Sequence, residues 1–169
     1  MRDRVVLVIV SDDVRLESGR ILEREIRERI PDAHVFYVDP TIASAATPEL
    51  LKATGEAEEV VVAVYAVPIP GARTFTNEIG SSDPTGTLIQ KVLDQVAQKT
   101  VVLALGNPYL AKDFPSIENY LCTFSNASIS ELSAVKAIFG EIPIRGHLPV
   151  TIPNIALRGA GIERPPAAK

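Results

Sequence analysis

The chain has 169 residues, of which 46% are hydrophobic and 22% charged, a composition typical of a folded globular protein. The formal charge of -4 argues against a nucleic-acid binder, which needs a basic stripe. One cysteine excludes an internal disulfide and, with only two histidines, leaves no familiar metal-site spacing, so we expect neither a metal nor a cofactor. No apolar run approaches the ~20 residues of a membrane helix, and the localisation stays open.

Short apolar segments alternate with amphipathic ones along the chain. Runs that are apolar at every position, such as 60–64 and 101–105, are typical of strands covered on both faces of a parallel sheet. We expect strands at residues 4–10, 33–38, 59–66, 100–105 and 120–124. We expect helices at residues 16–30, 47–53, 85–98 and 129–139, and at most a short one at 116–119.

Local signals predict where several of these helices begin and end. Thr47 and Pro48 are typical of a helix start, with a capping hydroxyl and proline in the first turn. Gly55 is expected to end that helix, and Gly140 to cap the carboxyl end of the last one.

Alternating strands and helices predict an α/β fold, a three-layer α/β/α sandwich. We expect a mostly parallel five-stranded sheet in the flavodoxin-like order 2-1-3-4-5. Residues 1–153 are expected to form a single domain, followed by a Pro-rich tail at 154–169. Within the domain, the extended strip 146–153 could cover a sheet edge or lie against a neighbouring domain.

Polar side chains follow the predicted strands at the edge where parallel sheets bind their ligands. We take as candidate ligand-binding residues Ser11, Asp12, Asp13, Asn107, Tyr109, Ser125 and Asn126. The alternative for the acidic pair is that Asp12 and Asp13 cap the following helix and interact with its dipole.

The common occupants of this fold each lack a required part. The turn after the first strand carries carboxylates instead of glycines, so nucleotide and flavin phosphates are disfavoured. A phospho-receiver domain needs an aspartate after the third strand and a lysine after the fifth, and an esterase needs GxSxG. Cys122 is expected to be a core residue, His34 to lie in an edge strand and His147 in the tail. We therefore assign no catalytic residue.

Five ordered segments carry a resemblance to a known family: ALGNPY at 104–109, FP at 114–115, YLCTFS at 120–125, SAVKAIFGE at 133–141 and IRGHLPVTIP at 144–153. Together they resemble the C-terminal domain of family-three glycoside hydrolases, in the bacterial beta-N-acetylhexosaminidase (beta-N-acetylglucosaminidase) branch. The resemblance implies a preceding (β/α)8 barrel that holds the nucleophile and the acid/base pair. In the beta-glucosidase branch the sandwich domain lends an acid/base glutamate. Glu78 is the only glutamate in the long 67–84 loop, but no family motif surrounds it.

The leading hypothesis is a glycosidase accessory domain that packs on a barrel absent from this chain and is inactive alone. Such a domain could complete one wall of a site for N-acetylated sugar. The first alternative is a free-standing module that binds carbohydrate or another small ligand. The second is an assembly domain that uses the 146–153 strip as its contact.

Overall fold

The centre of the molecule is a five-stranded sheet in which every neighbouring pair is parallel. The strand order is β2-β1-β3-β4-β5, as predicted. This computed structural model describes residues 4–168 except 13, 16 and 66–82. Its strands are β1 (Val5–Val10), β2 (His34–Val38), β3 (Glu59–Val64), β4 (Thr100–Ala104) and β5 (Asn119–Cys122).

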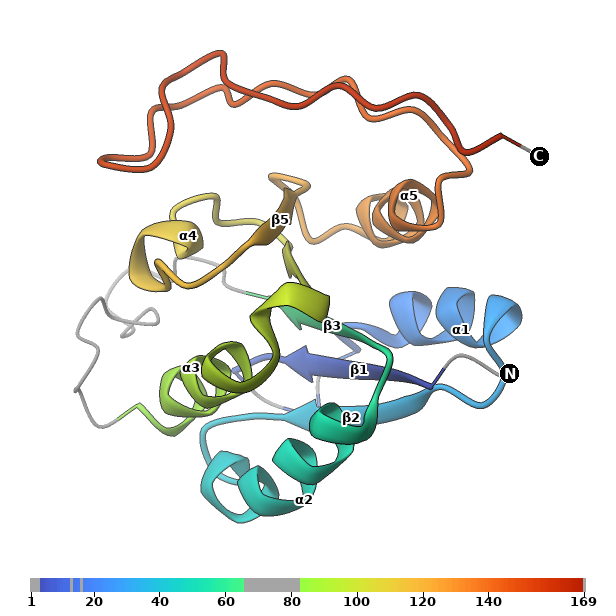
Figure 1. Ribbon diagram of the computed structural model, residues 1–169, viewed down its shortest axis with the longest axis vertical. Coiled ribbons are helices and arrows are strands. Elements are labelled where there is room, and N and C mark those ends of the chain that lie inside the picture. Colours follow the sequence, from blue (N-terminus) through green and yellow to red (C-terminus); the bar gives the residue numbers. More distant parts are fainter. Residues whose placement is uncertain (1–3, 13, 16, 66–82, 169) are drawn as a thin grey trace.

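Helices cover both faces of the sheet, because successive strand residues point to opposite sides. Val8, Val62 and Val102 belong to the core cluster that includes Leu50 of α2 and Leu88 of α3. The neighbouring strand residues belong to the opposite cluster, with α1 and α5. Figure 1 shows these layers. The helices are α1 (Arg20–Arg29), α2 (Ala43–Glu56), α3 (Pro84–Val96), η1 (Ala97–Lys99), α4 (Leu110–Asp113) and α5 (Ser128–Ile138).

The prediction for the start of α1 was wrong by four residues. The helix begins at Arg20 instead of residue 16, directly after Gly19, which has φ +82°. A Cβ atom at Gly19 would lie 2.7 Å from Cγ2 of Ile9, so only glycine lets the chain pass this close to β1. The helix start is therefore set by contact with the sheet.

The predicted start of α2 was also wrong. The helix begins at Ala43, because the carboxylate of Asp39 accepts hydrogen bonds from the backbone N–H groups of Thr41 (2.8 Å) and Ile42 (3.2 Å). The Thr47 hydroxyl donates to the carbonyl of Ala43 instead of capping a new helix. Pro48 therefore lies inside the helix. Gly55 lies inside it too, one residue before its end, so the predicted termination there was wrong.

Other boundaries moved less. The short helix expected at 116–119 lies instead at Leu110–Asp113, just after a turn in which Asn107 Oδ1 accepts a hydrogen bond from the Tyr109 N–H (2.9 Å). The remaining predicted elements agree with the structure to within two residues. Gly140 ends the last helix as predicted, with φ +68°, and the N–H of Glu141 donates back to the Lys136 carbonyl (2.8 Å).

After α5 the chain runs out and back as a two-stranded antiparallel ribbon, residues 142–168, which we name the arm. Backbone hydrogen bonds join Ile144 with Arg164 in both directions (2.9 Å each), and Ile152 forms a bridge with Ala156 near the tip. At the base, Ala167 donates to the carbonyl of Gly140 (2.8 Å). Figure 1 shows the arm at the top of the molecule, beyond β5 and α5. The predicted boundary between domain and tail, after residue 153, falls at its tip.

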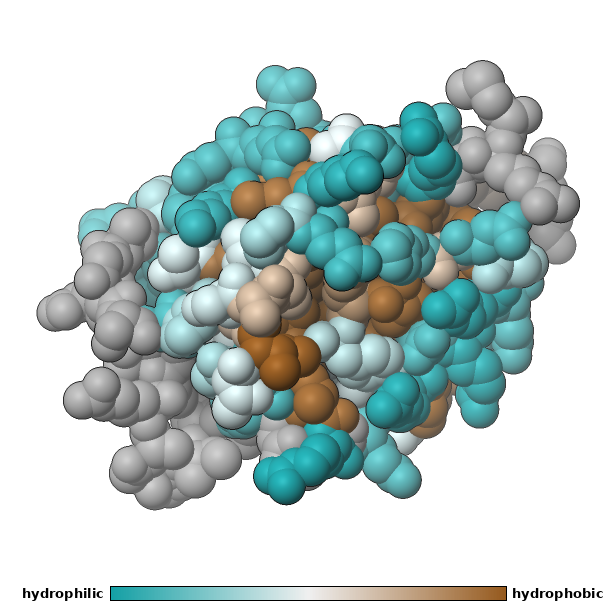
Figure 2. Space-filling view, turned by 90° about the horizontal axis from the view of Figure 1, so that it is seen from below, coloured by the Kyte–Doolittle hydropathy of each residue, from teal (hydrophilic) through white to brown (hydrophobic). Residues whose placement is uncertain are grey.

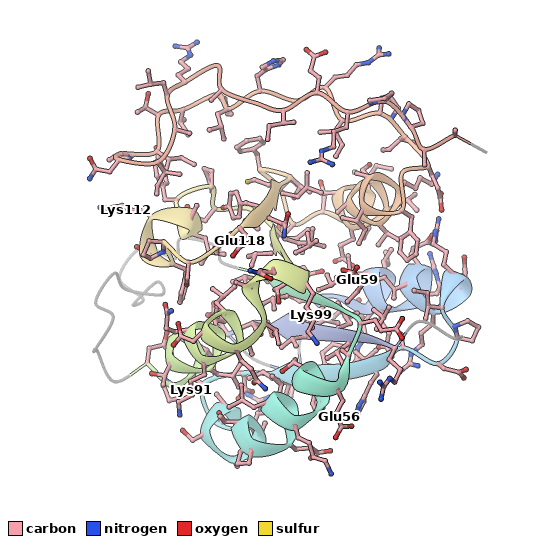
Figure 3. The ribbon with its side chains drawn as sticks, in the orientation of Figure 1. Glu56, Glu59, Lys91, Lys99, Lys112 and Glu118 are labelled. Carbon is pink, nitrogen blue, oxygen red and sulfur yellow. The ribbon has the colours of Figure 1, made fainter. Side chains whose placement is uncertain are left out.

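The opposite end of the molecule is formed by β2 and α2. His34 opens β2, an edge strand as predicted, and Val35 and Phe36 on that strand are half-buried. Figure 2 views the molecule from this end and shows apolar side chains gathered in a patch among polar ones. Figure 3 shows a face where basic and acidic side chains are interspersed, among them Lys99 and Glu59.

Candidate functional site

All five carboxyl ends of the strands meet at one rim of the sheet, because every pairing is parallel. Ser11 and Asp12 follow β1, Asn107 and Tyr109 follow β4, and Ser125 and Asn126 lie beyond the end of β5. Asp13 lies outside the described residues, as does Glu78. Strand β3 separates β1 from β4, which places these two groups roughly 10 Å apart at the usual strand spacing. The candidate residues share a rim but divide into two groups.

The group after β1 is acidic and only partly accessible. Ser11 is 3% exposed and its N–H donates to the Val38 carbonyl (3.0 Å), so it lies beneath the surface of the rim. Asp12 is exposed, and both partial burial and the nearby carboxylate of Asp83 raise its pKa. Asp83 itself caps α3 by accepting from the N–H of Thr85 (3.0 Å). Two carboxylates this close disfavour an anionic ligand.

The alternative role given to Asp12, capping α1, was wrong. That helix begins eight residues further on and is capped by Glu131, from the first turn of α5. Glu131 Oε2 accepts a hydrogen bond from the Leu22 N–H (2.8 Å), and Oε1 accepts one from Gly19 (3.4 Å). No sequence signal could have paired residues 109 positions apart.

The position taken by the Glu131 carboxylate decides what this rim can bind. In open parallel sheets, the helix N-terminus after the first strand, at the point where the strand order reverses, binds phosphate groups. Here Glu131 is 5% exposed and fills that position with the protein's own negative charge. A phosphate group at this position would meet the Glu131 carboxylate.

Tyr65 occupies the middle of the rim, directly after β3. It is 4% exposed, and its hydroxyl oxygen is buried without a hydrogen-bond partner of good geometry. Burial raises the pKa of this phenol, and the neighbouring carboxylate of Glu131 raises it further. The phenol therefore stays neutral. Tyr65 belongs to the core cluster on the α1 and α5 face of the sheet, and the sequence analysis did not select it.

The β4–β5 end of the rim is the more exposed part. Tyr109 is 41% exposed and Phe124 is 40% exposed. Phe124 has φ +57°, a left-handed conformation that is rare for a bulky residue. The sequence analysis missed Phe124, because nothing in the sequence marks a positive φ there. Ser125 Oγ accepts from the N–H of Ala127 (3.1 Å), so this hydroxyl also supports the start of α5.

The cysteine and the histidine of the arm, the other reactive side chains, have structural surroundings. Cys122 is half-buried on β5, and burial raises the pKa of its thiol, which disfavours a nucleophilic thiolate. His147 Nε2 lies 3.7 Å from Glu163 Oε1, across the arm. Within the described residues, no three His, Cys, Asp or Glu side chains lie close enough together to hold a metal ion. Across the same residues, no helix has the length and apolarity needed to cross a membrane.

Comparisons of the sequence with protein-family models and with curated proteins give no match. Three solved structures share the fold. The first is a fungal multi-domain GH3 beta-N-acetylglucosaminidase with a GCN5-related glucosamine N-acetyltransferase region. It has 23% sequence identity and a TM-score of 0.69, and the match covers 94% of this chain and 17% of that chain. A GH3 beta-N-acetylglucosaminidase from Paenibacillus sp. str. FPU-7 has 19% sequence identity and a TM-score of 0.64, and the match covers 89% of this chain and 27% of that chain. The beta-glucoside phosphorylase BglX, bound to 2FGlc, has 13% sequence identity and a TM-score of 0.53, and the match covers 83% of this chain and 24% of that chain.

These comparisons confirm the predicted fold. This chain spans only 17%, 27% and 24% of the length of these three structures.

Proposed function

We propose that this chain is the accessory α/β sandwich of a family-three glycoside hydrolase and supports a (β/α)8 catalytic barrel located elsewhere in the enzyme. The observation that carries the proposal is the pair of structural neighbours with TM-scores of 0.69 and 0.64. Both are GH3 beta-N-acetylglucosaminidases, and both match nearly all of this chain with a minor part of their own. We extend the proposal to beta-N-acetylhexosaminides as the substrate class of the whole enzyme.

The hydrogen bonding of the carboxylates at the rim favours an accessory role for this domain over a catalytic one. Acid/base catalysis on a glycosidic bond needs two carboxyl groups directed at the same bond. At this rim Asp39 and Glu131 are committed to backbone N–H groups, and Asp83 caps a helix. For Asp39 these hydrogen bonds lower the pKa and so favour the ionised form, which disfavours a role as a proton donor.

Activity assays test the proposal at two levels. We expect the 169-residue chain to show no turnover of 4-nitrophenyl N-acetyl-beta-glucosaminide. The polypeptide encoded by the complete reading frame should hydrolyse it. Turnover by the isolated chain, at a rate that survives further purification, would overturn the accessory role. A reading frame without a barrel would overturn the proposal as a whole.

A second candidate function is sugar binding at the exposed end of the rim. Aromatic faces beside amide and hydroxyl groups suit a sugar ring, and Tyr109 and Phe124 expose aromatic surface next to Asn107 and Asn126. We expect weak heat on calorimetric titration with millimolar N-acetylglucosamine, reduced at least about threefold in Tyr109→Ala. Absence of heat in the parent chain would remove this candidate and leave the accessory role untouched.

A further inference from the structure

Two glycines, one within the arm and one just before it, permit the close approaches that form the arm. A Cβ atom at Gly161 would lie 2.6 Å from the backbone oxygen of Gly146 on the opposite strand of the arm. At the base, a Cβ atom at Gly140 would lie 2.8 Å from Cβ of Ala167. Both distances are too short for any other residue, so the sequence is adapted to bring the two strands together.

The two strands of the arm have different surroundings. The first contributes Ile152, which is 2% exposed, and half-buried residues such as Ile144 and Leu148. The returning strand is exposed at nearly every position. Along it, Ile155 is 48%, Leu157 74% and Ile162 72% exposed. Single exposed aliphatic residues are ordinary, but three within eight residues form a strip that water solvates poorly.

The arm also differs from the rest of the chain in charge. The arm, residues 142–168, contains three basic side chains and one acidic, whereas residues 1–141 contain thirteen basic and twenty acidic ones. Arg158 and Arg164 lie on the returning strand, among the exposed aliphatic residues. A surface that fits this strip is apolar with an acidic rim.

The size of the strip favours a partner in the same polypeptide. A stable complex between separate molecules usually needs about 800 Å² of surface on each side, more than a few aliphatic side chains supply. A covalently linked partner is held at millimolar effective concentration, so a small contact is sufficient. The fungal neighbour leaves only 6% of this chain unmatched, less than the length of the arm, so the match extends into the arm in a chain several times longer.

We propose that the returning strand of the arm, residues 155–164, docks on an apolar surface with an acidic rim on the catalytic domain of the same polypeptide. This inference rests on the proposed function and identifies the surface through which the sandwich supports its barrel. The body of the domain contributes the platform that holds the arm in place, and Ile155, Leu157 and Ile162 provide the contact.

Hydrogen exchange measured by mass spectrometry tests the inference, with the 169-residue chain compared with the full-length polypeptide. Peptides covering residues 155–164 should exchange at least about tenfold more slowly in the full-length protein. Equal exchange rates in a full-length protein that contains a barrel overturn the inference but leave the proposed function standing. A reading frame without a barrel removes both, so the two failures are distinguishable.

Variants separate docking from folding. Leu157→Asp combined with Ile162→Asp should leave the melting temperature of the isolated chain unchanged, because both side chains are exposed, and should abolish the slower exchange in the full-length protein. Ile42→Asp is the control: Ile42 is 38% exposed at the start of α2, at the opposite end of the molecule, and should have no effect on the arm. Retained protection in the double variant contradicts the inference. So does a dimer of the isolated chain that Leu157→Asp dissociates, since a second copy would then occupy the strip.

Discussion

Glu131 Oε2 accepts a hydrogen bond of 2.8 Å from the backbone N–H of Leu22, and this contact joins two helices that are far apart in the sequence. Helices α1 and α5 lie side by side on the same face of the sheet. The contact therefore caps α1 from its neighbour and fixes how the two helices pack. It also fills the position at which related architectures hold phosphate.

We expect Glu131→Ala to lower the free energy of unfolding by about 1–3 kcal/mol, because it removes the acceptor for buried N–H groups at the start of α1. Glu131→Gln should cost less, since its amide oxygen can still accept from Leu22. Urea denaturation measures both. Glu28→Gln on the exposed side of α1 serves as the control and should change stability by less than about 0.5 kcal/mol. A loss in the control as large as in Glu131→Ala would show that charge alone is responsible.

The carboxylate of Asp39 should make the stability of the folded protein depend on pH. Its hydrogen bonds, first from the Thr41 hydroxyl and then from backbone N–H groups including that of Val14, lower its pKa, while burial opposes them. A lowered pKa in the folded state stabilises the protein above the ordinary aspartate pKa near 3.8. That contribution is lost as the pH falls through the lower, folded-state value.

We expect Asp39→Asn to be less stable than the parent at pH 7 by about 1–2 kcal/mol, and the difference to shrink as the pH approaches 3. Thermal melts at pH 7, 5 and 3 measure it. A difference that is the same at all three values would contradict the role of the ionised carboxylate.

The C-terminal end of α2 depends on Lys99. Its ammonium group donates to the carbonyl of Gly55 (3.1 Å), in the last turn of α2, and to that of Ala57, just after the helix. Lys99→Met retains most of the side-chain stem and removes the charge. It should destabilise the domain by about 0.5–1 kcal/mol at low ionic strength and by less in 1 M salt. Lys91→Met on α3, also labelled in Figure 3, provides the comparison. An equal effect of both substitutions would argue against a specific cap.

The arm gives a matched pair of glycine substitutions. Gly161→Ala places a methyl group against the carbonyl oxygen of Gly146, whereas a Cβ atom at Gly146 meets nothing within 4 Å. We expect Gly161→Ala to open the arm, so that limited trypsin digestion after Arg158 is several-fold faster. Gly146→Ala should be cut at the parental rate. Equal rates for the two variants would show that the close approach is not needed.

The sequence by itself determined the sheet. Runs such as Val60–Val64 are apolar at every position, which only a strand covered on both faces tolerates, and the alternation with helices leaves few possible topologies. Gly140 likewise marked the end of α5, because a left-handed residue there requires glycine. These features depend on residues close together in the chain.

Only the tertiary structure decided which groups occupy the rim and where the helices begin. The cap on α1 comes from Glu131, and the start of α2 comes from Asp39 instead of Thr47. The half-buried first strand of the arm and its exposed returning strand also became distinct only in three dimensions. In each case hydrogen bonds or packing between distant segments outweigh local preferences, because a buried N–H group without a partner costs more than a local propensity contributes.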